Sequence, residues 1–367
     1  DELWWGFGWY SAYELTGEFR YLNRSRAIFD DIVNRSWSNA SCNGGACWQA
    51  TADPRDMDQC YKNAITNELF LSLAARLSSS YSRRCRLALA ERSSTVEPHT
   101  QSVDCAAAIH TAGWAQTALK WFVGSGIINS SMLINDGLDT FDHHAEVCRN
   151  NRRTAYTYNQ GVLLSGLGAL WADQRAAAST HSLELAAVRT NGVQAGTSST
   201  TMLEPIEPLR LAAAVVEAVW ASSLVYKGSG GVLREMNEAM LQQGTLPNLY
   251  DGNPGTDGLQ FKSVLLRHLR YLIDAVTDAS ESEEEAQAAI AAVGGNLTVW
   301  RQRIVHNAQT IWEHAACVRG VPYTPGVNVT IPPLFGYLWL GPCSWAFGGP
   351  SATTQTSALD AFVAAIF

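Results

Sequence analysis

The sequence is poor in charge, and the charge it carries is mainly negative. Only 16% of the 367 residues are Asp, Glu, Lys or Arg, and the formal net charge is −8 at pH 7. A chain that neutralises phosphate groups instead carries an excess of Lys and Arg. We therefore expect neither nucleic acid nor an anionic membrane surface as a partner.

Long apolar runs are also missing. The best stretch, from Leu211 to Leu224, is shorter than a bilayer requires and is interrupted by Glu217. Neither a signal peptide nor a lipid-anchor motif is visible. We expect no transmembrane segment and interpret the sequence as a processed chain, trimmed at its N-terminus.

Metal-binding spacings are absent as well. No Cys-x-x-Cys pattern supports a zinc site, and the adjacent His143 and His144 after Asp142 point apart on a loop. The acidic run 281–285 suggests calcium at first, but Ser282 and Glu285 have the spacing of a helix capping box. We expect no metal and no cofactor.

No stretch alternates between apolar and polar residues as a strand does, so the fold class is all-α. A helix from residue 1 ends at Thr16-Gly17, and a second one follows through Val33, which predicts a helical hairpin. Further helices are predicted from about 61, over 109–124, after 157, and over 209–226, 255–278, 297–317 and 353–367. Residues 78–108 and 176–208 are predicted to be irregular. Recurring helix pairs with long loops indicate a closed toroid, one domain over 1–367, with a cleft at one end.

Cysteines and glycosylation sequons are plentiful, and together they indicate a secreted protein. The eight cysteines allow 105 pairings, and we interpret Cys42 and Cys47 as closing a tight loop through Gly44 and Gly45. Six Asn-x-Ser/Thr sequons begin at Asn23, Asn34, Asn39, Asn129, Asn296 and Asn328.

An aromatic residue and two carboxamides stand together where a loop enters the helix after residue 157. Tyr158 can cover the C–H face of a sugar, while Asn159 and Gln160 each offer donors and acceptors to hydroxyl groups. An ordinary helix N-terminus with one buried aromatic is the alternative interpretation. On the helix from about 61, Asn63 and Asn67 share one face.

Several landmarks in one order give the chain a family resemblance that covers nearly all of its length. It resembles glycoside hydrolase family 76, the endo-α-1,6-mannanases and the related fungal cell-wall transglycosidases. The landmarks are Trp4-Trp5, Tyr13 to Gly17, Tyr61 to Phe70, Asn135 to Asp139, Thr157 to Gly161, Gln260-Phe261-Lys262 and Gln355 to Asp360. The resemblance implies an (α/α)6 barrel and a retaining mechanism with two carboxylates.

The resemblance also implies a catalytic residue. The family has two adjacent aspartates followed by x-x-Trp-Trp, and aligning on Trp4-Trp5 places Asp1 on the second aspartate, the acid/base. The first aspartate, the expected nucleophile, would precede residue 1. Taking Asp1 and Glu2 as the pair instead requires a one-residue deletion, which rotates the carboxyl groups by about 100° on a helix.

The remaining binding residues follow from the same landmarks. We expect Trp4, Trp5, Asn63, Asn67, Asp136, Tyr158, Asn159, Gln160, Gln260 and Lys262 to contact substrate. One of the two tryptophans is expected to pack in the core and at least one to face the cleft, and Asp136 is alternatively a turn residue ahead of Gly137. Ser263 departs from the family, which usually has glycine there.

Three functions are open at this stage. The first is a retaining endo-α-1,6-mannanase, the second a transglycosidase that moves a mannose-containing glycan onto another polysaccharide, and the third a non-catalytic carbohydrate-binding protein. In each case we expect a mannose-containing polysaccharide or oligosaccharide as partner and a monomer. The expected location is secreted or at the cell wall or cell surface, with an anchor after Phe367 as one form of attachment.

Overall fold

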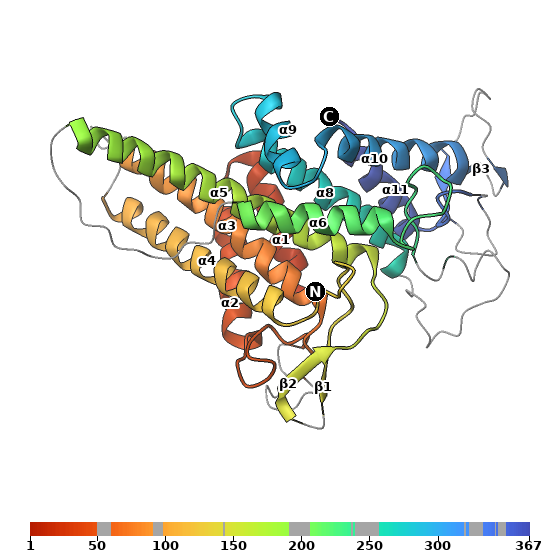
Figure 1. Ribbon diagram of the computed structural model, residues 1–367, viewed down its shortest axis with the longest axis horizontal. Helices are drawn as coiled ribbons and strands as arrows, with labels where there is room; N and C mark the ends of the chain where they lie inside the picture. Colours follow the sequence, from red (N-terminus) through yellow and green to blue (C-terminus); the bar gives the residue numbers. More distant parts are fainter. Residues whose placement is uncertain are drawn as a thin grey trace.

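Helices make up most of the computed structural model, which describes residues 1–49, 60–90, 98–141, 144–190, 206–235, 238, 257–318, 321–322, 333–341, 343 and 350–367 (Figure 1). The helices are α1 (Glu2–Thr16), α2 (Phe19–Ser36), α3 (Ala64–Ala90), α4 (Pro98–Gly124), α5 (Thr157–Thr190), α6 (Ile206–Ala221), α8 (Phe261–Asp278), α9 (Glu283–Ala292), α10 (Leu297–Thr310) and α11 (Ala352–Ala364). A short 3-10 turn, η1 (Asp257–Gln260), precedes α8, and a π-helical turn, η2 (Ile311–Ala315), extends α10.

Five of the described helices, α1, α3, α5, α8 and α11, run parallel, each packed beside the next. Their direction follows from contacts that advance together along each pair of neighbours. Between α1 and α3 they join Gly6 to Leu73 and Tyr10 to Ser80, and between α3 and α5 they join Ser72 to Val162 and Ser78 to Asp173. Between α5 and α8 they join Gly161 to Leu265 and Gly168 to Leu272, and between α8 and α11 they join Arg267 to Asp360 and Arg270 to Ala364. The N-terminal ends of these inner helices therefore gather at one end of the array, which we call the N-end.

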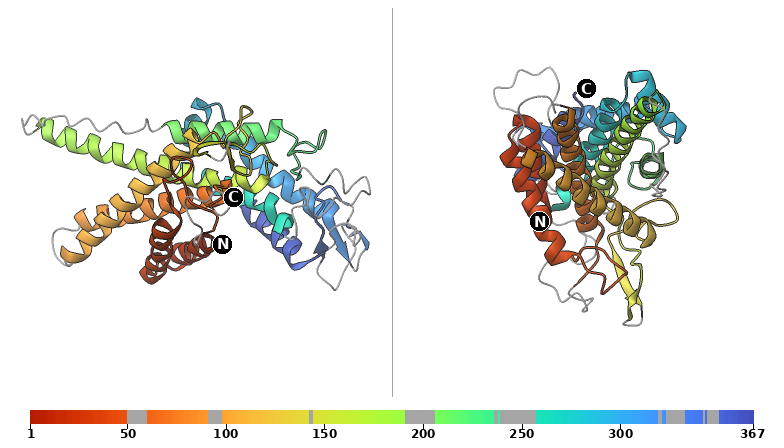
Figure 2. Two further views of the ribbon diagram at one scale, coloured as in Figure 1. Left: turned by 90° about the horizontal axis from the view of Figure 1, so that it is seen from below. Right: turned by 90° about the vertical axis from the view of Figure 1, so that its left-hand side faces the viewer.

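Other helices return along the outside. The turn between α1 and α2 is made by Gly17, whose φ of 69° is left-handed and whose N–H donates to the carbonyl of Tyr13. This confirms the predicted hairpin, because glycine adopts this backbone conformation without strain. In the same way α4 packs on α3, and α6 on α5 (Figures 1 and 2).

One continuous apolar core joins the helices, and α3 illustrates why. Its positions 69, 73 and 77 are buried leucines and Ile65 is partly buried, as the helical spacing predicts. Of the described helices, none has both the length and the hydropathy to cross a bilayer.

Short strands occur where the sequence showed no alternation. Strands β1 (Leu138–Phe141) and β2 (His144–Asn150) pair antiparallel and project from the body (Figure 1 and the right-hand view of Figure 2). A smaller sheet joins β3 (Ala316–Val318), β4 (Val321–Pro322) and β5 (Leu334–Phe335). Four of the five described strands have four residues or fewer, which is too few to show a period of two, so the all-α class holds while its loops contain sheet.

Two predicted irregular regions are wrong in part. Helix α3 continues to Ala90 and α4 begins at Pro98, so 78–108 is largely helical; α5 likewise runs to Thr190. Ser and Arg on these extensions suggested loops, but neighbouring helices override such weak propensities. Residues 91–97 and 191–205 lie outside the described part of the chain.

The predicted Cys42–Cys47 loop is also wrong. Cys42 pairs with Cys148, 106 residues away, and Cys47 pairs with Cys60. A third disulfide joins Cys85 to Cys105, between α3 and α4. The Cys42–Cys148 bond ties the loop after α2 to the β1–β2 hairpin. Asp142 and His143 lie outside the described residues.

Candidate active site

Asp1 and the loops before α3, α5 and α8 all lie at the N-end. Asp1 precedes Gly6 by five residues, and Glu68 precedes Leu73, the neighbour of Gly6, by the same number. Because parallel helices rise equally per residue, Asp1 and Glu68 are at about the same height. Asp1 is exposed, and its side chain makes no capping hydrogen bond to α1. Its carboxylate is therefore free to meet a ligand.

Asp136 lies beside the start of α3 and is half-buried. Its Oδ2 accepts a hydrogen bond from the hydroxyl of Tyr61 at 2.6 Å, and that hydroxyl in turn accepts one from Asn151 Nδ2 at 2.7 Å. A Cβ at Gly137 would lie 2.5 Å from the Tyr61 hydroxyl, so only glycine permits this arrangement. Burial and the neighbouring Asp136 raise the pKa of Tyr61, which therefore stays a neutral donor.

Tyr158 is half-buried and joins α5 to α8. Its ring stacks on Phe261, the first residue of α8. Gly161 makes this possible, because a Cβ there would lie 2.5 Å from the Cα of Leu265. The two helices thus approach at backbone distance and bring both rings to the N-end. Burial, with Asp136 and Glu68 nearby, raises the pKa of Tyr158.

The carboxamides predicted beside Tyr158 differ from each other. Gln160 is buried and bonds the backbone of Ile134 twice, its Oε1 accepting from N and its Nε2 donating to O, both at 2.8 Å. Asn159 is fully buried, and neither Oδ1 nor Nδ2 has a hydrogen-bond partner in the described chain. Sugar contact by either residue stays a prediction.

Asn63 and Asn67 are likewise buried. Asn63 Oδ1 accepts from the backbone of Thr66, capping α3. Asn67 bonds both backbone groups of Ala46, at 2.7 Å to its N and 3.1 Å to its O. The Asn67 amide therefore holds the loop after α2 against α3, whereas Asn63 caps the helix, and a direct role in binding stays a prediction for both.

Trp4 and Trp5 point to different sides of α1. Trp4 is partly buried, with its ring centroid 6.5 Å from that of His268 on α8. Trp5 is 69% exposed and lines a 340 Å³ groove with Trp9 and Arg24 between α1 and α2. Trp4 thus faces the inner helices and Trp5 the outside, and which of them contacts a sugar stays a prediction.

Lys262 is fully buried at the start of α8, in an ion pair rather than in an open cleft. Its Nζ donates to Glu238 Oε1 at 2.6 Å and to the carbonyl of Tyr337 at 2.7 Å. Glu238 also accepts from the hydroxyl of Tyr226. Gln260 is half-buried just before this pair and begins α8 without a side-chain cap. Lys262 thus holds the start of α8 against Glu238 and Tyr337. Contact with substrate by Gln260 or Lys262 stays a prediction.

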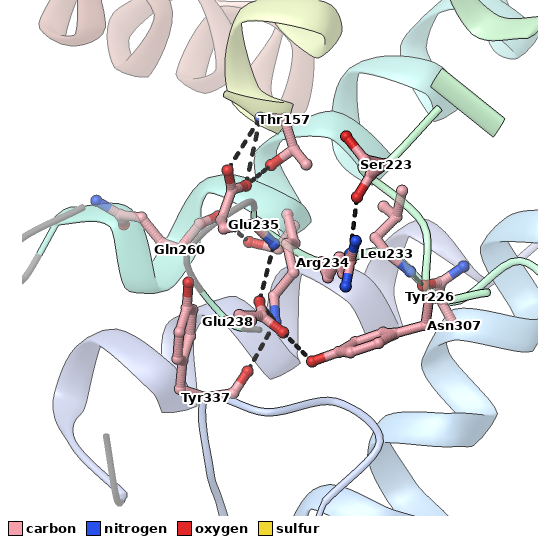
Figure 3. A network of polar contacts seen from close by, with 12 residues as sticks. Thr157, Ser223, Tyr226, Leu233, Arg234, Glu235, Glu238, Gln260, Asn307 and Tyr337 are labelled. Atoms are coloured by element: carbon pink, nitrogen blue, oxygen red, sulfur yellow. Dashed lines mark hydrogen bonds and ion pairs between the residues drawn. The ribbon is translucent and has the colours of Figure 1, made fainter. Parts of the chain in front are cut away.

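Glu235 belongs to the same network and contacts the start of α5. Its carboxyl group accepts from the hydroxyl of Thr157 and, at 3.3 Å, from the backbone N–H of that residue (Figure 3). Burial raises the pKa of Glu235 to about 8, although the Thr157 bonds oppose the shift. Glu235 therefore fixes the residue immediately before Tyr158.

Four polar residues near the N-end received no separate role from the sequence: Tyr61, Glu68, Glu235 and Glu238. The first two stand inside a recognised landmark, but their contacts depend on residues more than 60 positions away. Glu235 and Glu238 follow a loop with no pattern of its own. Among the described residues, no group of three or more His, Cys, Asp or Glu side chains could hold a metal ion.

Comparison with known proteins links this arrangement to a family. Residues 1–93 match the profile of glycosyl hydrolase family 76. The chain is 26% identical over 179 residues to mannan endo-1,6-alpha-mannosidase DCW1 of Saccharomyces cerevisiae, a match that covers 47% of this chain and 33% of that protein. It is 25% identical over 158 residues to the enzyme of the same description, DFG5, from that yeast, covering 42% of this chain and 27% of the relative. The matches thus span about a third of the length of these curated relatives.

Solved structures share the architecture. One is an inactive variant of the alpha-1,6-mannanase GH76A of Salegentibacter sp. HEL1_6, with two aspartates replaced by alanine, in complex with alpha-1,6-mannotetrose. It has a TM-score of 0.58 and 18% identity, and the match covers 99% of this chain and 74% of that one. Another is a family 76 glycoside hydrolase from a bovine Bacteroides thetaiotaomicron strain, with a TM-score of 0.51, 15% identity and coverage of 99% and 55%.

These structural matches extend over nearly the whole chain, whereas the sequence matches concentrate on part of it. The predicted (α/α)6 barrel is confirmed by the helical architecture and by these neighbours. The family profile, the yeast relatives and the solved structures agree with one another: residues 1–93 match glycosyl hydrolase family 76, and the whole chain has the fold of solved members of that family.

Proposed function

We propose that this protein is a glycoside hydrolase that cleaves α-1,6-mannan within the chain and retains the anomeric configuration. The observation that carries the proposal is the position of Asp1. It lies in the segment that matches the family profile, and it stands exposed at the N-end, where Asp136 and Tyr158 also lie. An acid, a hydroxyl acceptor and an aromatic ring at one end of a barrel suit a bound sugar.

The proposed role of Asp1 is that of general acid. Cleavage of an acetal passes through an oxocarbenium-like state, so the departing oxygen needs a proton while the anomeric carbon is attacked from the other face. In a retaining enzyme a second carboxylate, about 5–5.5 Å from the first, makes that attack. Asp1, at the first turn of α1 and without a protein partner in its capping position, is placed to donate to a glycosidic oxygen.

Asp136 and Tyr158 are proposed to position the sugar. Tyr61 occupies Oδ2 of Asp136, which leaves Oδ1 for a sugar hydroxyl. One face of the Tyr158 ring is covered by Phe261, so sugar contact is restricted to the other face and to the hydroxyl. Tyr158 packs against the edge of the apolar core, and Glu68 lies near both residues.

The decisive experiment is product analysis on linear α-1,6-mannan. We expect a ladder of α-1,6-mannooligosaccharides, with the α-anomer formed first when the products are followed by NMR. Exo-release of mannose alone, or the β-anomer as first product, contradicts the proposal. Products elongated at the expense of hydrolysis when an acceptor glycan is added would show a transglycosidase, and binding without cleavage would show a carbohydrate-binding protein.

A secreted or cell-wall location is proposed on the disulfides. Three are formed in the described part of the chain, including one between positions 106 residues apart. Such bonds persist in oxidising compartments. The sequon residues Asn23, Asn34 and Asn39 are exposed and accessible to glycosylation. Peptide mapping of protein recovered from its native source, with and without glycosidase treatment, tests this placement.

A further inference from the structure

Two buried side chains at the N-end have polar groups that the protein leaves unsatisfied. Glu68 and Asn159 are both 0% exposed, and none of Glu68 Oε1 and Oε2 or Asn159 Oδ1 and Nδ2 has a hydrogen-bond partner within the described residues. A buried polar group without a partner costs about 1–3 kcal/mol. Leaving four such atoms unpaired is a large cost for one small region, and it points to a ligand.

Both side chains lie in the seam between α3 and α5. Ser72 Oγ donates to the carbonyl of Val162, and Glu68 lies one helical turn before Ser72. Gly166 packs against Ser72 on the same seam, and Asn159 lies seven residues, about two turns, before Gly166. The carboxyl and carboxamide groups therefore belong to one cluster beneath the N-end.

Charged and aromatic groups of the proposed site surround this cluster. Asp136 acts electrostatically on Glu68, and Asp136 and Glu68 both act on Tyr158. Asp136 uses Oδ2 for Tyr61, and its Oδ1 receives no hydrogen bond from the described chain. The cluster therefore lies next to Asp136 and Tyr158, the residues proposed to position the sugar.

We propose that Glu68 and Asn159 form a positioning pair that binds one buried water molecule and, through it, holds Asp136 and Tyr158 in place for the sugar. This inference rests on the proposed function. A buried water makes about three hydrogen bonds to otherwise unsatisfied groups. Glu68 and Asn159 supply two of these bonds. Asp136, whose charge acts on Glu68, supplies the third through Oδ1, which has one lone pair for the water and one for a sugar hydroxyl.

The charge state of Glu68 agrees with this role. Burial raises the pKa of Glu68 well above its ordinary value, and the neighbouring Asp136 raises it further. The shift favours the neutral acid, which has one O–H donor and one acceptor, and Asn159 offers two donors and an acceptor. A neutral acid can share a water with the Asp136 carboxylate, whereas a second carboxylate would repel it.

The test separates hydrogen bonding from charge and from simple packing. Glu68→Gln keeps a neutral donor and acceptor of the same shape, and Glu68→Met removes both in a side chain of similar length. We expect Glu68→Gln to cleave α-1,6-mannan within about threefold of the wild type with an unchanged pH profile. We expect Glu68→Met to lose about 10- to 100-fold in kcat/KM, as for one lost buried hydrogen bond, without a lower Tm.

Gln174 provides a matched control. Its amide oxygen is also buried without a partner, but it lies 15 residues beyond Asn159 on α5, roughly 22 Å along the axis. Gln174→Met should leave kcat/KM unchanged. If Glu68→Met keeps full activity, or if Glu68→Gln loses as much as Glu68→Met, the positioning pair is wrong.

A measurement independent of catalysis distinguishes failure of this inference from failure of the proposed function. The infrared difference between the wild type and Glu68→Gln at pH 7 should contain the C=O band of a protonated carboxylic acid. A carboxylate band in its place overturns the inference even in an active enzyme. The acid band in a protein that does not cleave or bind mannan would refute the proposed function and the positioning role, while keeping the neutral buried acid.

Discussion

The ring of Tyr158 lies flat on the ring of Phe261, with centroids 3.8 Å apart and an angle of 8° between the planes. The contact joins the second residue of α5 to the first residue of α8, which are 103 positions apart in the sequence. The contact fixes the starts of α5 and α8, which carry the landmarks Thr157 to Gly161 and Gln260-Phe261-Lys262. The pair therefore connects the packing of the barrel with its proposed sugar site.

Substitution of Tyr158 should separate ring from hydroxyl. Tyr158→Phe keeps the stack on Phe261, so its stability should change little, while oligosaccharide affinity reports the hydroxyl alone. Tyr158→Ala loses the stack and should destabilise the protein. Truncation of a buried aromatic side chain costs about 3–5 kcal/mol, and the cost here should be smaller because the ring is only half-buried. Urea unfolding and calorimetric titration with mannotetraose measure the two effects. Equal affinities for all three proteins would remove Tyr158 from the site.

Replacing Gly161 by Ala should destabilise the barrel although alanine is the better helix former. The added Cβ meets the Cα of Leu265 at 2.5 Å, so α5 and α8 must separate, at a cost of about 1–3 kcal/mol. Gly113 in α4 is the control, because a Cβ there meets nothing within 4 Å. Gly113→Ala should stabilise by about 0.5–1 kcal/mol. A stabilised Gly161→Ala variant in thermal unfolding would contradict the close approach.

Asp1→Asn should abolish most cleavage without changing the fold. The amide has nearly the shape of the acid but donates no acidic proton, and general acids typically contribute about 10²–10⁴-fold. Mannan should be affected most, and an aryl mannoside whose leaving group departs unaided should be affected least. The control is Glu2→Gln, since Glu2 faces Arg35 of α2 on the outside of the hairpin. Equal losses on the two substrates would make Asp1 the nucleophile instead.

Replacing one partner of the buried Lys262–Glu238 ion pair should destabilise the protein more than replacing both partners. Lys262→Met leaves the Glu238 carboxylate buried without its cation, and loss of one partner of a buried pair costs about 3–5 kcal/mol. Glu238 keeps its bonds from Tyr226 and from the backbone of Glu235, which lowers this cost. The double variant Lys262→Met, Glu238→Gln should recover part of the loss in urea unfolding. Additive losses would show that the two side chains act independently.

The contribution of Glu235 to stability should fall as the pH rises from about 4.5 to about 8. Its pKa is raised to about 8 by burial, so the folded protein keeps a proton that the unfolded chain releases near 4.5. Within this window the free energy of unfolding decreases by about 1.4 kcal/mol per pH unit for one such proton. Glu235→Gln should flatten the slope by up to that amount between pH 6.5 and 8.

His268 affects how stability depends on pH on the acid side. Burial lowers the pKa of His268 well below its ordinary value, so the unfolded chain binds a proton near pH 6.5 that the folded protein refuses. Its contribution to stability is therefore lost as the pH falls below about 6.5. Unfolding free energies of Glu235→Gln and the wild type from pH 5 to 8 test both signs. A wild-type curve that rises steadily to pH 8 would exclude the assignment for Glu235.

Much of the fold could be predicted from the sequence because local features specify it. Gly17 ends α1 and Ser282 caps α9 through the N–H of Glu285, each through contacts within a few residues. The leucines of α3 repeat at helical spacing along the buried face. The extension of α3 could not be predicted, because its Ser and Arg residues lie in a helix on which α4 packs and to which the Cys85–Cys105 disulfide joins α4.

The sequence landmarks identified residues of the candidate site but not the contacts that these residues make. Gln160 and Asn67 were recognised, yet their amides bond backbone atoms of residues 26 and 21 positions away, which no local pattern encodes. Glu238 and Lys262 are 24 positions apart, and no local pattern pairs them. The burial that raises the pKa of Glu68 is likewise a property of the packed seam between α3 and α5.

The Cys42–Cys148 disulfide has a consequence for biosynthesis. Cys42 leaves the ribosome with Cys47 only five residues behind it, and its native partner follows about a hundred residues later. At roughly 5–20 residues per second of synthesis, Cys42 waits for several seconds while nearer thiols are available. A Cys42–Cys47 bond formed in that interval must be opened by thiol–disulfide exchange before the hairpin β1–β2 can be fastened. Efficient oxidative folding of this protein should therefore depend on a disulfide isomerase, whereas the Cys85–Cys105 bond needs only an oxidant.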